Sequence, residues 1–334
     1  GALYEAEMSS AASALIGKSV YRKDKLALLW RDVLFNQFHD ILPGCGMVFT
    51  REYALGKFQD VLAGANMISK SSFESLARGI DLSSILPESM PEEGETANGA
   101  GVGILPDRLN GELGLSFNMR HSQVGRGTGP VRVFHLFNGS QYARRQGVSL
   151  MVWDFRGDTE KLAVYGSDHK PLPFAMVKSG YNQYWAHFYT ELLIETDIPP
   201  LGYETVYLKE TDPKEGSVYR YSHSDPRVNK YPSYILENDY VRAEFDETTM
   251  DLITLTDKES GRIRFSRPEG KRGGGFRYLK ENGRQASAWV VGETLSSNDC
   301  PREIRDRSKE ENPVRQTIGY TLKLAASELK VTVH

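Results

Sequence analysis

Apolar residues in the first part of the chain recur at intervals of three and four. This spacing predicts helices over residues 2–17, 24–39 and 50–79. We expect Asp24 and Thr50 to cap the second and third helices. The predicted apolar face of the second helix consists of Leu26, Leu29, Trp30, Val33, Leu34 and Gln37. Short connections between the three helices predict an antiparallel bundle over residues 1–85.

From Val131 onward the pattern changes to the alternation that is typical of strands, with clear runs at 131–136, 148–153 and 185–189. Turn residues separate these runs about every ten positions, which favours β-sandwiches. We expect a Gly- and Pro-rich linker at 86–129 and a small sandwich at 130–212. The first part of a larger sandwich is expected at 230–334, truncated because a strand-like run reaches the last residue. The predicted fold is α+β and multidomain, a three-helix bundle followed by β-sandwich domains.

Composition excludes several classes of protein. Of the 334 residues, 40% are hydrophobic and 25% are charged, as in soluble globular proteins. The net charge of -3 argues against a nucleic-acid partner. The two cysteines lie far apart in sequence and suggest a reducing compartment, so we expect a cytoplasmic protein. No apolar run approaches the roughly 20 residues of a membrane span, and no signal peptide is visible at the start.

The candidate chemistry lies in one short segment. His39 and Asp40 stand side by side at the predicted end of the second helix, before the helix-breaking run Leu42-Pro43-Gly44. A helix that ends in this pair can direct a metal ligand and a carboxylate into a cleft. Taken without its surroundings, such a pair is more often a surface or capping pair.

The surrounding residues 30–44, WRDVLFNQFHDILPG, resemble the glycoside hydrolase family 38 α-mannosidases. In that family a Gln-x-His-Asp segment closes the catalytic domain and opens a helical one. Weaker similarities extend the resemblance over nearly the whole chain, at residues 3–7, 133–138, 198–203, 237–241 and 256–261. The resemblance implies a helical middle domain, a small β-sandwich and part of a large sandwich of the mutarotase type.

The resemblance also implies roles for the two residues. His39 would be one ligand of a catalytic zinc, and Asp40 would contact the sugar. The family's remaining metal ligands, its nucleophile and its acid/base aspartate belong to a catalytic domain that precedes the region of resemblance. A retaining glycosidase needs two carboxylates about 5 Å apart, and Asp40 alone cannot fill both roles.

We therefore expect the C-terminal portion of a retaining, zinc-dependent α-mannosidase that hydrolyses α-mannosyl linkages in glycans or oligosaccharides. Its partners would be a mannose-containing oligosaccharide and the missing N-terminal catalytic domain, with no nucleic acid and no membrane. The chain by itself would contain no catalytic residue, would hold no tightly bound zinc and would be inactive.

Two rival functions remain open, a non-catalytic carbohydrate-binding β-sandwich protein with a helical appendage and a scaffold or interaction module. Other motifs are better explained by structure. The glycines at 99–103 lack the spacing of a nucleotide-binding loop. Asn138-Gly139-Ser140 fits the N-glycosylation pattern, but a tight turn after a strand is favoured. Trp289 is expected to pack in a sandwich core, although contact with a sugar is the alternative.

Overall fold

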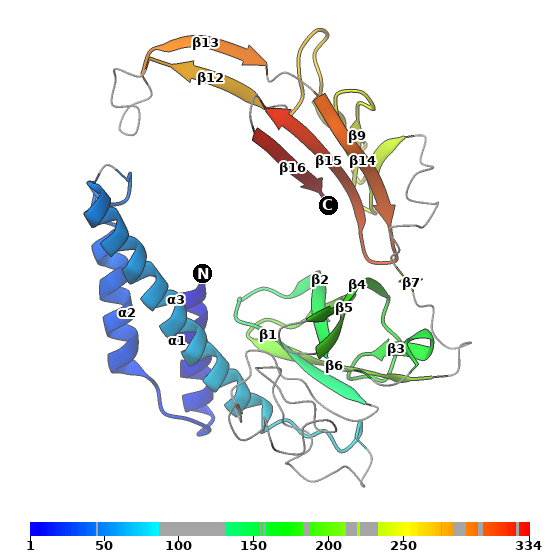
Figure 1. Cartoon of the computed structure of the whole chain (residues 1–334). Helices are drawn as coiled ribbons and strands as arrows, with labels where there is room; N and C mark the ends of the chain where they lie inside the picture. The colour runs from blue at the N-terminus through cyan, green and yellow to red at the C-terminus, as the bar shows by residue number, and fades with distance from the viewer. Residues whose placement is uncertain are drawn as a thin grey trace. The chain divides into compact units, whose positions relative to one another are not determined.

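The computed structural model describes residues 1–44, 46–86, 131–153, 155, 158–182, 187–211, 219–220, 233–274, 276–282, 292–299, 303–324 and 327–334. The chain divides into two compact units, residues 1–219 and residues 220–334 (Figure 1). In the described residues, the first unit contains three helices and a small β-sandwich, and the second contains antiparallel sheets. The predicted order, helices followed by antiparallel β structure, is confirmed.

The three helices are α1 (Ala2–Leu15), α2 (Lys23–Asn36) and α3 (Val48–Ala77). Their apolar faces meet in one core made of Leu3, Ala6, Leu26, Leu29, Val61, Ala65 and Ile68. The predicted caps are wrong. Arg22 and Met47 occupy the N-cap positions of α2 and α3, and no side chain there makes a cap hydrogen bond. Helix stability therefore comes from packing of the apolar faces more than from capping.

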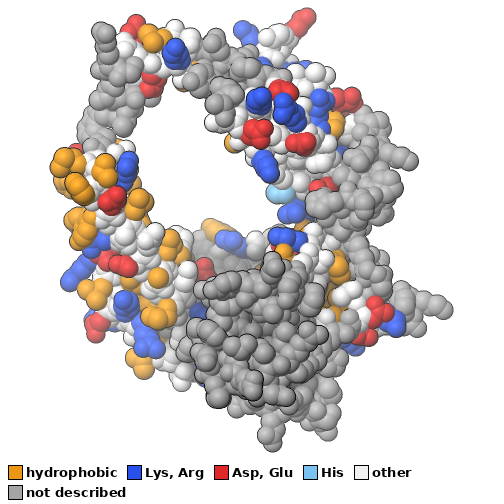
Figure 2. All heavy atoms as spheres, in the orientation of Figure 1, with side chains coloured by type: hydrophobic (Ala, Val, Ile, Leu, Met, Phe, Trp, Pro, Cys, Tyr) orange, Lys and Arg blue, Asp and Glu red, His pale blue; other side chains and the backbone are white. Residues whose placement is uncertain are grey.

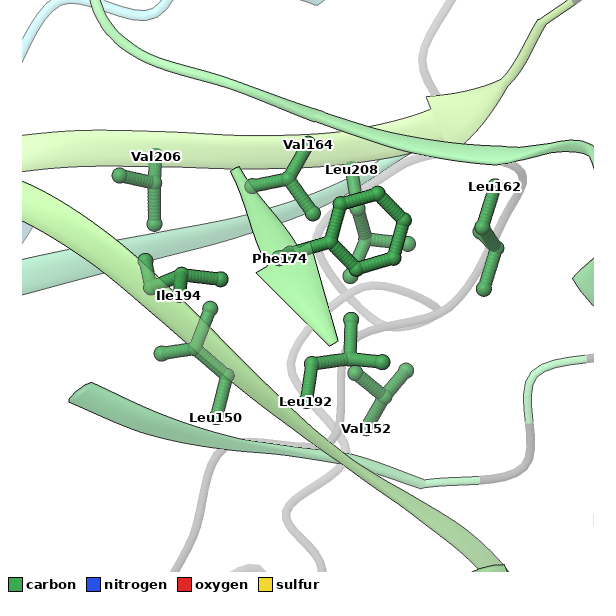
Figure 3. Packing of buried hydrophobic residues seen from close by; sticks show 9 residues of the cluster. All are labelled: Leu150, Val152, Leu162, Val164, Phe174, Leu192, Ile194, Val206 and Leu208. Carbon is green, nitrogen blue, oxygen red and sulfur yellow. The ribbon is translucent and has the colours of Figure 1, made fainter. Parts of the chain in front are cut away.

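The small sandwich has two antiparallel sheets, one ordered β1-β6-β3 and one that includes β2, β5 and β4 in that order. The strand bounds are β1 (Arg132–Asn138), β2 (Arg144–Trp153), β3 (Leu162–Tyr165), β4 (Phe174–Asn182), β5 (His187–Ile198) and β6 (Gly202–Glu210), with a 3-10 turn at Thr159–Lys161 and the short β7 at Tyr219–Arg220. Nine buried side chains from five strands fill the space between the sheets (Figure 3): Leu150, Val152, Leu162, Val164, Phe174, Leu192, Ile194, Val206 and Leu208.

The predicted turn after β1 is present. The Ser140 backbone N–H donates to Asn138 Oδ1 at 2.9 Å, and Asn138 Nδ2 donates to the carbonyls of Tyr142, Ile198 and Pro199 at 2.8, 3.3 and 3.0 Å. Asn138 is only 6% exposed. Because its amide is buried and engaged with three carbonyls, this asparagine serves the turn and is not available to carry a glycan.

The described part of the second unit forms antiparallel sheets ordered β11-β10-β9-β8, β12-β13 and β14-β15-β16. The bounds are β8 (Tyr234–Glu237), β9 (Val241–Phe245), β10 (Leu252–Asp257), β11 (Ile263–Ser266), β12 (Arg277–Glu281), β13 (Thr294–Asp299), β14 (Glu303–Glu311), β15 (Gln316–Leu324) and β16 (Ser327–Val333). A hydrogen bond of 2.7 Å from the Glu237 N–H to Gln316 Oε1 joins β8 to β15. Among its described residues, the buried hydrophobic side chains are Met250, Ile318 and Leu322.

Several predictions fall outside the described residues. They include the linker at 86–129 apart from Leu86, the glycines at 99–103 and Trp289. Within the described part of the chain, the search for a helix long and apolar enough to cross a membrane found none.

Candidate functional site

The segment that carries His39 and Asp40 is a turn and not the last part of a helix. The sequence pattern predicts a second helix that continues to His39, but α2 ends at Asn36. Beyond Asn36 the chain forms a turn, in which the N–H groups of Ile41 and Leu42 both donate to the Phe38 carbonyl at 2.9 Å. The Ile41 bond closes a four-residue turn from Phe38 to Ile41. We call residues 37–44, which follow α2 directly, the His-Asp loop.

His39 and Asp40 are the two central residues of this turn, so their side chains project from it. The side chain of His39 is 73% exposed and that of Asp40 is 59% exposed. His39 Nε2 lies 3.5 Å from Asp40 Oδ2, and the ring centroids of Phe38 and His39 are 4.3 Å apart. The two predicted site residues therefore lie together at the surface, with the imidazole nitrogen of His39 beside the carboxylate oxygen of Asp40.

Exposed hydrophobic side chains surround the His-Asp loop. They gather over the helices (Figure 2) and include Leu34, Phe35, Phe38, Leu42, Met47, Val48, Phe49, Tyr53 and Leu55. Phe49 is 81% exposed and Met47 is 77% exposed. Contiguous apolar patches of this kind commonly mark a surface that another part of a protein covers.

Two contacts on the outer side of the helices hold α2 against α3 close to the loop. Lys57 Nζ lies 2.5 Å from Asp32 Oδ1, and the rings of Phe35 and Tyr53 meet edge to face with centroids 5.8 Å apart. Lys57 also lies over both rings. The hydrogen bond to Asp32 is the main reason that the pKa of Lys57 is raised. These contacts set the distance between the two helices at the end where the His-Asp loop connects them.

Among the described residues of the first unit, two cavities are relevant to the site. One of about 200 Å³ lies between the His-Asp loop and α3 and is lined by residues that include Asn36, Ile41, Leu42, Thr50, Ala54 and Phe58. A larger cavity of about 540 Å³ is lined by α1, the end of α3 and the ends of β1 and β6. Because its lining does not include His39 or Asp40, the larger cavity is separate from the predicted site.

Three other histidines have structural hydrogen bonds, as the sequence suggested. Nδ1 of His135 lies 2.9 Å from Thr205 Oγ1, and Nδ1 of His169 lies 2.9 Å from the Tyr207 hydroxyl. Burial lowers the pKa of His135, which favours the neutral ring. His334 similarly contacts a threonine hydroxyl. The side chains of His121, His187 and His223 lie outside the described residues.

In the described part of the chain, no group of three or more His, Cys, Asp or Glu side chains could hold a metal ion. The sequence contains one His-x-Asp spacing, His223-Ser224-Asp225, but these residues are not described. A catalytic zinc usually has three protein ligands and an open position. The exposed imidazole of His39 could supply one ligand of that set, and the described residues around it do not supply the others.

A family model described as the α-mannosidase middle domain matches residues 1–76. The matched region contains α1, α2, the His-Asp loop and nearly all of α3. His39 and Asp40 therefore lie inside the matched region.

Two of the similar solved structures align with nearly the whole chain. An α-mannosidase from Enterococcus faecalis V583 aligns with 96% of the chain at 15% identity and a TM-score of 0.58. A protein in glycosyl hydrolase family 38 from Enterococcus faecalis aligns with 98% of it at 15% identity and a TM-score of 0.59. The chain spans 33% and 38% of the length of these two proteins. No curated protein sequence matches the chain. The resemblance to family 38 α-mannosidases is thus confirmed in sequence for the middle domain and in fold for the rest.

The sequence pattern missed one residue at this site. Asn36 is fully buried, whereas Leu34 and Gln37, which were placed on the buried face, are exposed. The available signal was spacing, because positions 26, 29, 33 and 36 fall at intervals of three and four on one helical face. Asn36 is polar, and buried positions on a helical face are ordinarily expected to be apolar, so its residue type argued against burial.

Proposed function

We propose that this chain is part of a retaining, zinc-dependent α-mannosidase that hydrolyses α-mannosyl linkages in glycans or oligosaccharides. The observation that carries the proposal is the position of His39 and Asp40 in an exposed turn inside the region that matches the α-mannosidase middle domain. A non-catalytic carbohydrate-binding module would have no need of a paired imidazole and carboxylate at this point.

In the proposed site the neutral imidazole of His39 contributes one ligand to zinc, and the carboxylate of Asp40 accepts hydrogen bonds from mannose hydroxyls. A bound zinc would supply Lewis-acid stabilisation at the sugar hydroxyls. Because His39 and Asp40 project from a turn held by backbone hydrogen bonds, the backbone positions from which their side chains extend are held before substrate binds. Asp40 serves binding and orientation, and the bond-breaking chemistry requires two further carboxylates about 5 Å apart.

Those carboxylates would come from a catalytic domain that accompanies this region in the complete enzyme. Two observations support such a partner. The chain spans only 33% and 38% of the two solved proteins that it resembles. The exposed apolar side chains around the His-Asp loop form a surface that a catalytic domain could cover while bringing its own ligands to His39.

The first test compares the 334-residue chain with the longer protein that contains it. Both are assayed with an aryl α-mannoside in the presence of added zinc, and metal content is measured after dialysis. We expect turnover and retained zinc for the longer protein, and neither for the 334-residue chain. Turnover by the 334-residue chain itself would refute the division of the site between two regions, and absence of turnover by the longer protein would refute the mannosidase function.

A further inference from the structure

Asn36 occupies a position where a polar side chain is unexpected. It is the last residue of α2, is fully buried and shares a helical face with Leu26 and Leu29 of the helical core. Its Nδ2 donates a hydrogen bond of 2.8 Å to the backbone carbonyl of Ala54 on α3. This bond ties the last residue of α2 directly to the neighbouring helix, in addition to the contacts that Asp32 and Phe35 make with α3.

Stability alone does not account for this asparagine. Its Oδ1 is buried and accepts no hydrogen bond from the described residues. A buried acceptor without a partner destabilises the folded state, so an apolar residue of similar size would pack at lower cost. The Ala54 carbonyl does not require Asn36 either, because as an interior carbonyl of α3 it faces the N–H of Phe58 in the regular helical pattern. The Asn36–Ala54 bond thus fixes a position more than it adds stability.

The position that it fixes is the start of the His-Asp loop. His39 follows Asn36 by three residues, and a cavity of about 200 Å³ lies between Ile41, Leu42 and Gly44 of the loop and α3. A loop that lies over a cavity receives little support from packing beneath it, so its placement depends on where its ends are held. Asn36 holds the end that is nearest to His39 and Asp40.

We propose that Asn36 is a positioning residue that acts through the His-Asp loop to hold His39 and Asp40 in the orientation that the site requires. The expected effect of Asn36 on zinc and mannose binding rests on the proposed function, whereas its expected effect on the position of the His-Asp loop does not. Asn36 touches neither metal nor substrate in this proposal. Its hydrogen bond to α3 sets the direction in which the chain leaves α2. Because the turn at Phe38–Ile41 follows directly, this direction determines where the side chains of His39 and Asp40 point.

The test replaces Asn36 with leucine, which removes both the amide donor and the buried acceptor while nearly keeping the volume. Leu29→Ala is the matched control, because Leu29 is buried on the same helix but lies two turns from the loop. In the 334-residue chain, hydrogen exchange is measured at the N–H groups of Ile41 and Leu42, together with the melting temperature. We expect Asn36→Leu to accelerate exchange in the loop by about tenfold or more with no fall in melting temperature. Leu29→Ala should lower the melting temperature without a selective effect on the loop.

The same variants in the longer protein give a second measurement. Asn36→Leu should lower zinc affinity and kcat/KM by about tenfold or more, as loss of an outer partner of a metal ligand commonly does, whereas Leu29→Ala should leave zinc affinity near normal at a temperature where it is folded. Unchanged loop exchange in Asn36→Leu, or equal zinc affinity in both variants, would overturn the proposal. If the longer protein neither binds zinc nor cleaves mannosides, the proposed function fails while the loop exchange still tests Asn36.

A measurement on the unaltered chain covers the case in which Asn36→Leu does not fold. The side-chain amide protons of Asn36, observed by NMR after selective labelling of asparagine, should exchange slowly because one of them is bonded to the Ala54 carbonyl in a buried site. Slow exchange of these amide protons supports the hydrogen bond between Asn36 of α2 and the Ala54 carbonyl of α3. Rapid exchange, at the rate of an exposed asparagine, would show that the tie is absent and would overturn the proposal.

Discussion

His39→Ala should abolish most of the proposed activity and leave the stability of the fold nearly unchanged. The His39 side chain is 73% exposed and projects from a turn that is closed by backbone hydrogen bonds, so its removal leaves the turn and the helical core intact. A surface substitution of this kind changes the free energy of unfolding by within about 0.5 kcal/mol. For a unit of this size the melting temperature should move by no more than about 2 °C.

The effect on the proposed enzyme should be much larger. Loss of an outer partner of a metal ligand commonly reduces metal affinity or activity by about 10- to 100-fold. Loss of a ligand itself should exceed that, so we expect kcat/KM in the longer protein to fall by more than about 100-fold and zinc to be lost on dialysis. Such a fall corresponds to at least about 2.7 kcal/mol of lost transition-state stabilisation.

Leu26→Ala provides the contrasting control. Leu26 is 2% exposed in the core of the helical domain, and removal of a buried leucine costs about 2–5 kcal/mol. Its melting temperature should fall by about 4–20 °C, but the folded protein should retain zinc. The measurements are zinc content, thermal unfolding and kcat/KM for both variants. Near-normal activity of His39→Ala would refute its role as a ligand, and a large loss of stability would refute the exposed geometry of the turn.

Three further substitutions test other parts of the chain. In the longer protein, Asp40→Asn should raise KM for a mannoside and leave zinc content nearly unchanged, because the amide keeps the shape but loses the anionic acceptor; loss of zinc would contradict this. Asn138→Ala should destabilise the first unit by about 2–4 kcal/mol in urea unfolding, since it removes a buried amide that bonds three carbonyls. Burial of Asp246 opposes its ionisation, but hydrogen bonds from Thr249 and Arg267 outweigh burial and lower its pKa to about 2. The resulting stabilisation is present above the unfolded pKa of about 3.8 and is lost as the pH falls toward about 2. Asp246→Asn should therefore cost up to about 2 kcal/mol at neutral pH, a difference that shrinks below about pH 4; a pH-independent difference would contradict the linkage.

The sequence by itself predicted the elements and their order. Helical spacing located all three helices to within three residues at each end, and alternation located parts of three strands of the small sandwich, β1, β2 and β5. Both signals are local, because a helix or strand repeats its buried face within a few residues. The sequence also singled out His39 and Asp40, since their residue types and surroundings resemble a known site without any need to know where the chain folds.

The tertiary structure decided what depends on distant partners. Apolar spacing could not show that α2 stops at Asn36, or that this residue is bonded to the Ala54 carbonyl on α3, because its partner lies 18 residues away. Nor could it show that Asn138 is buried, because the carbonyls that engage its amide include two that lie 60 and 61 residues away. Hydrogen bonds between segments far apart in sequence leave no periodic trace in either segment. For that reason the sequence determined which residues are candidates, and only the folded structure determined how they are held.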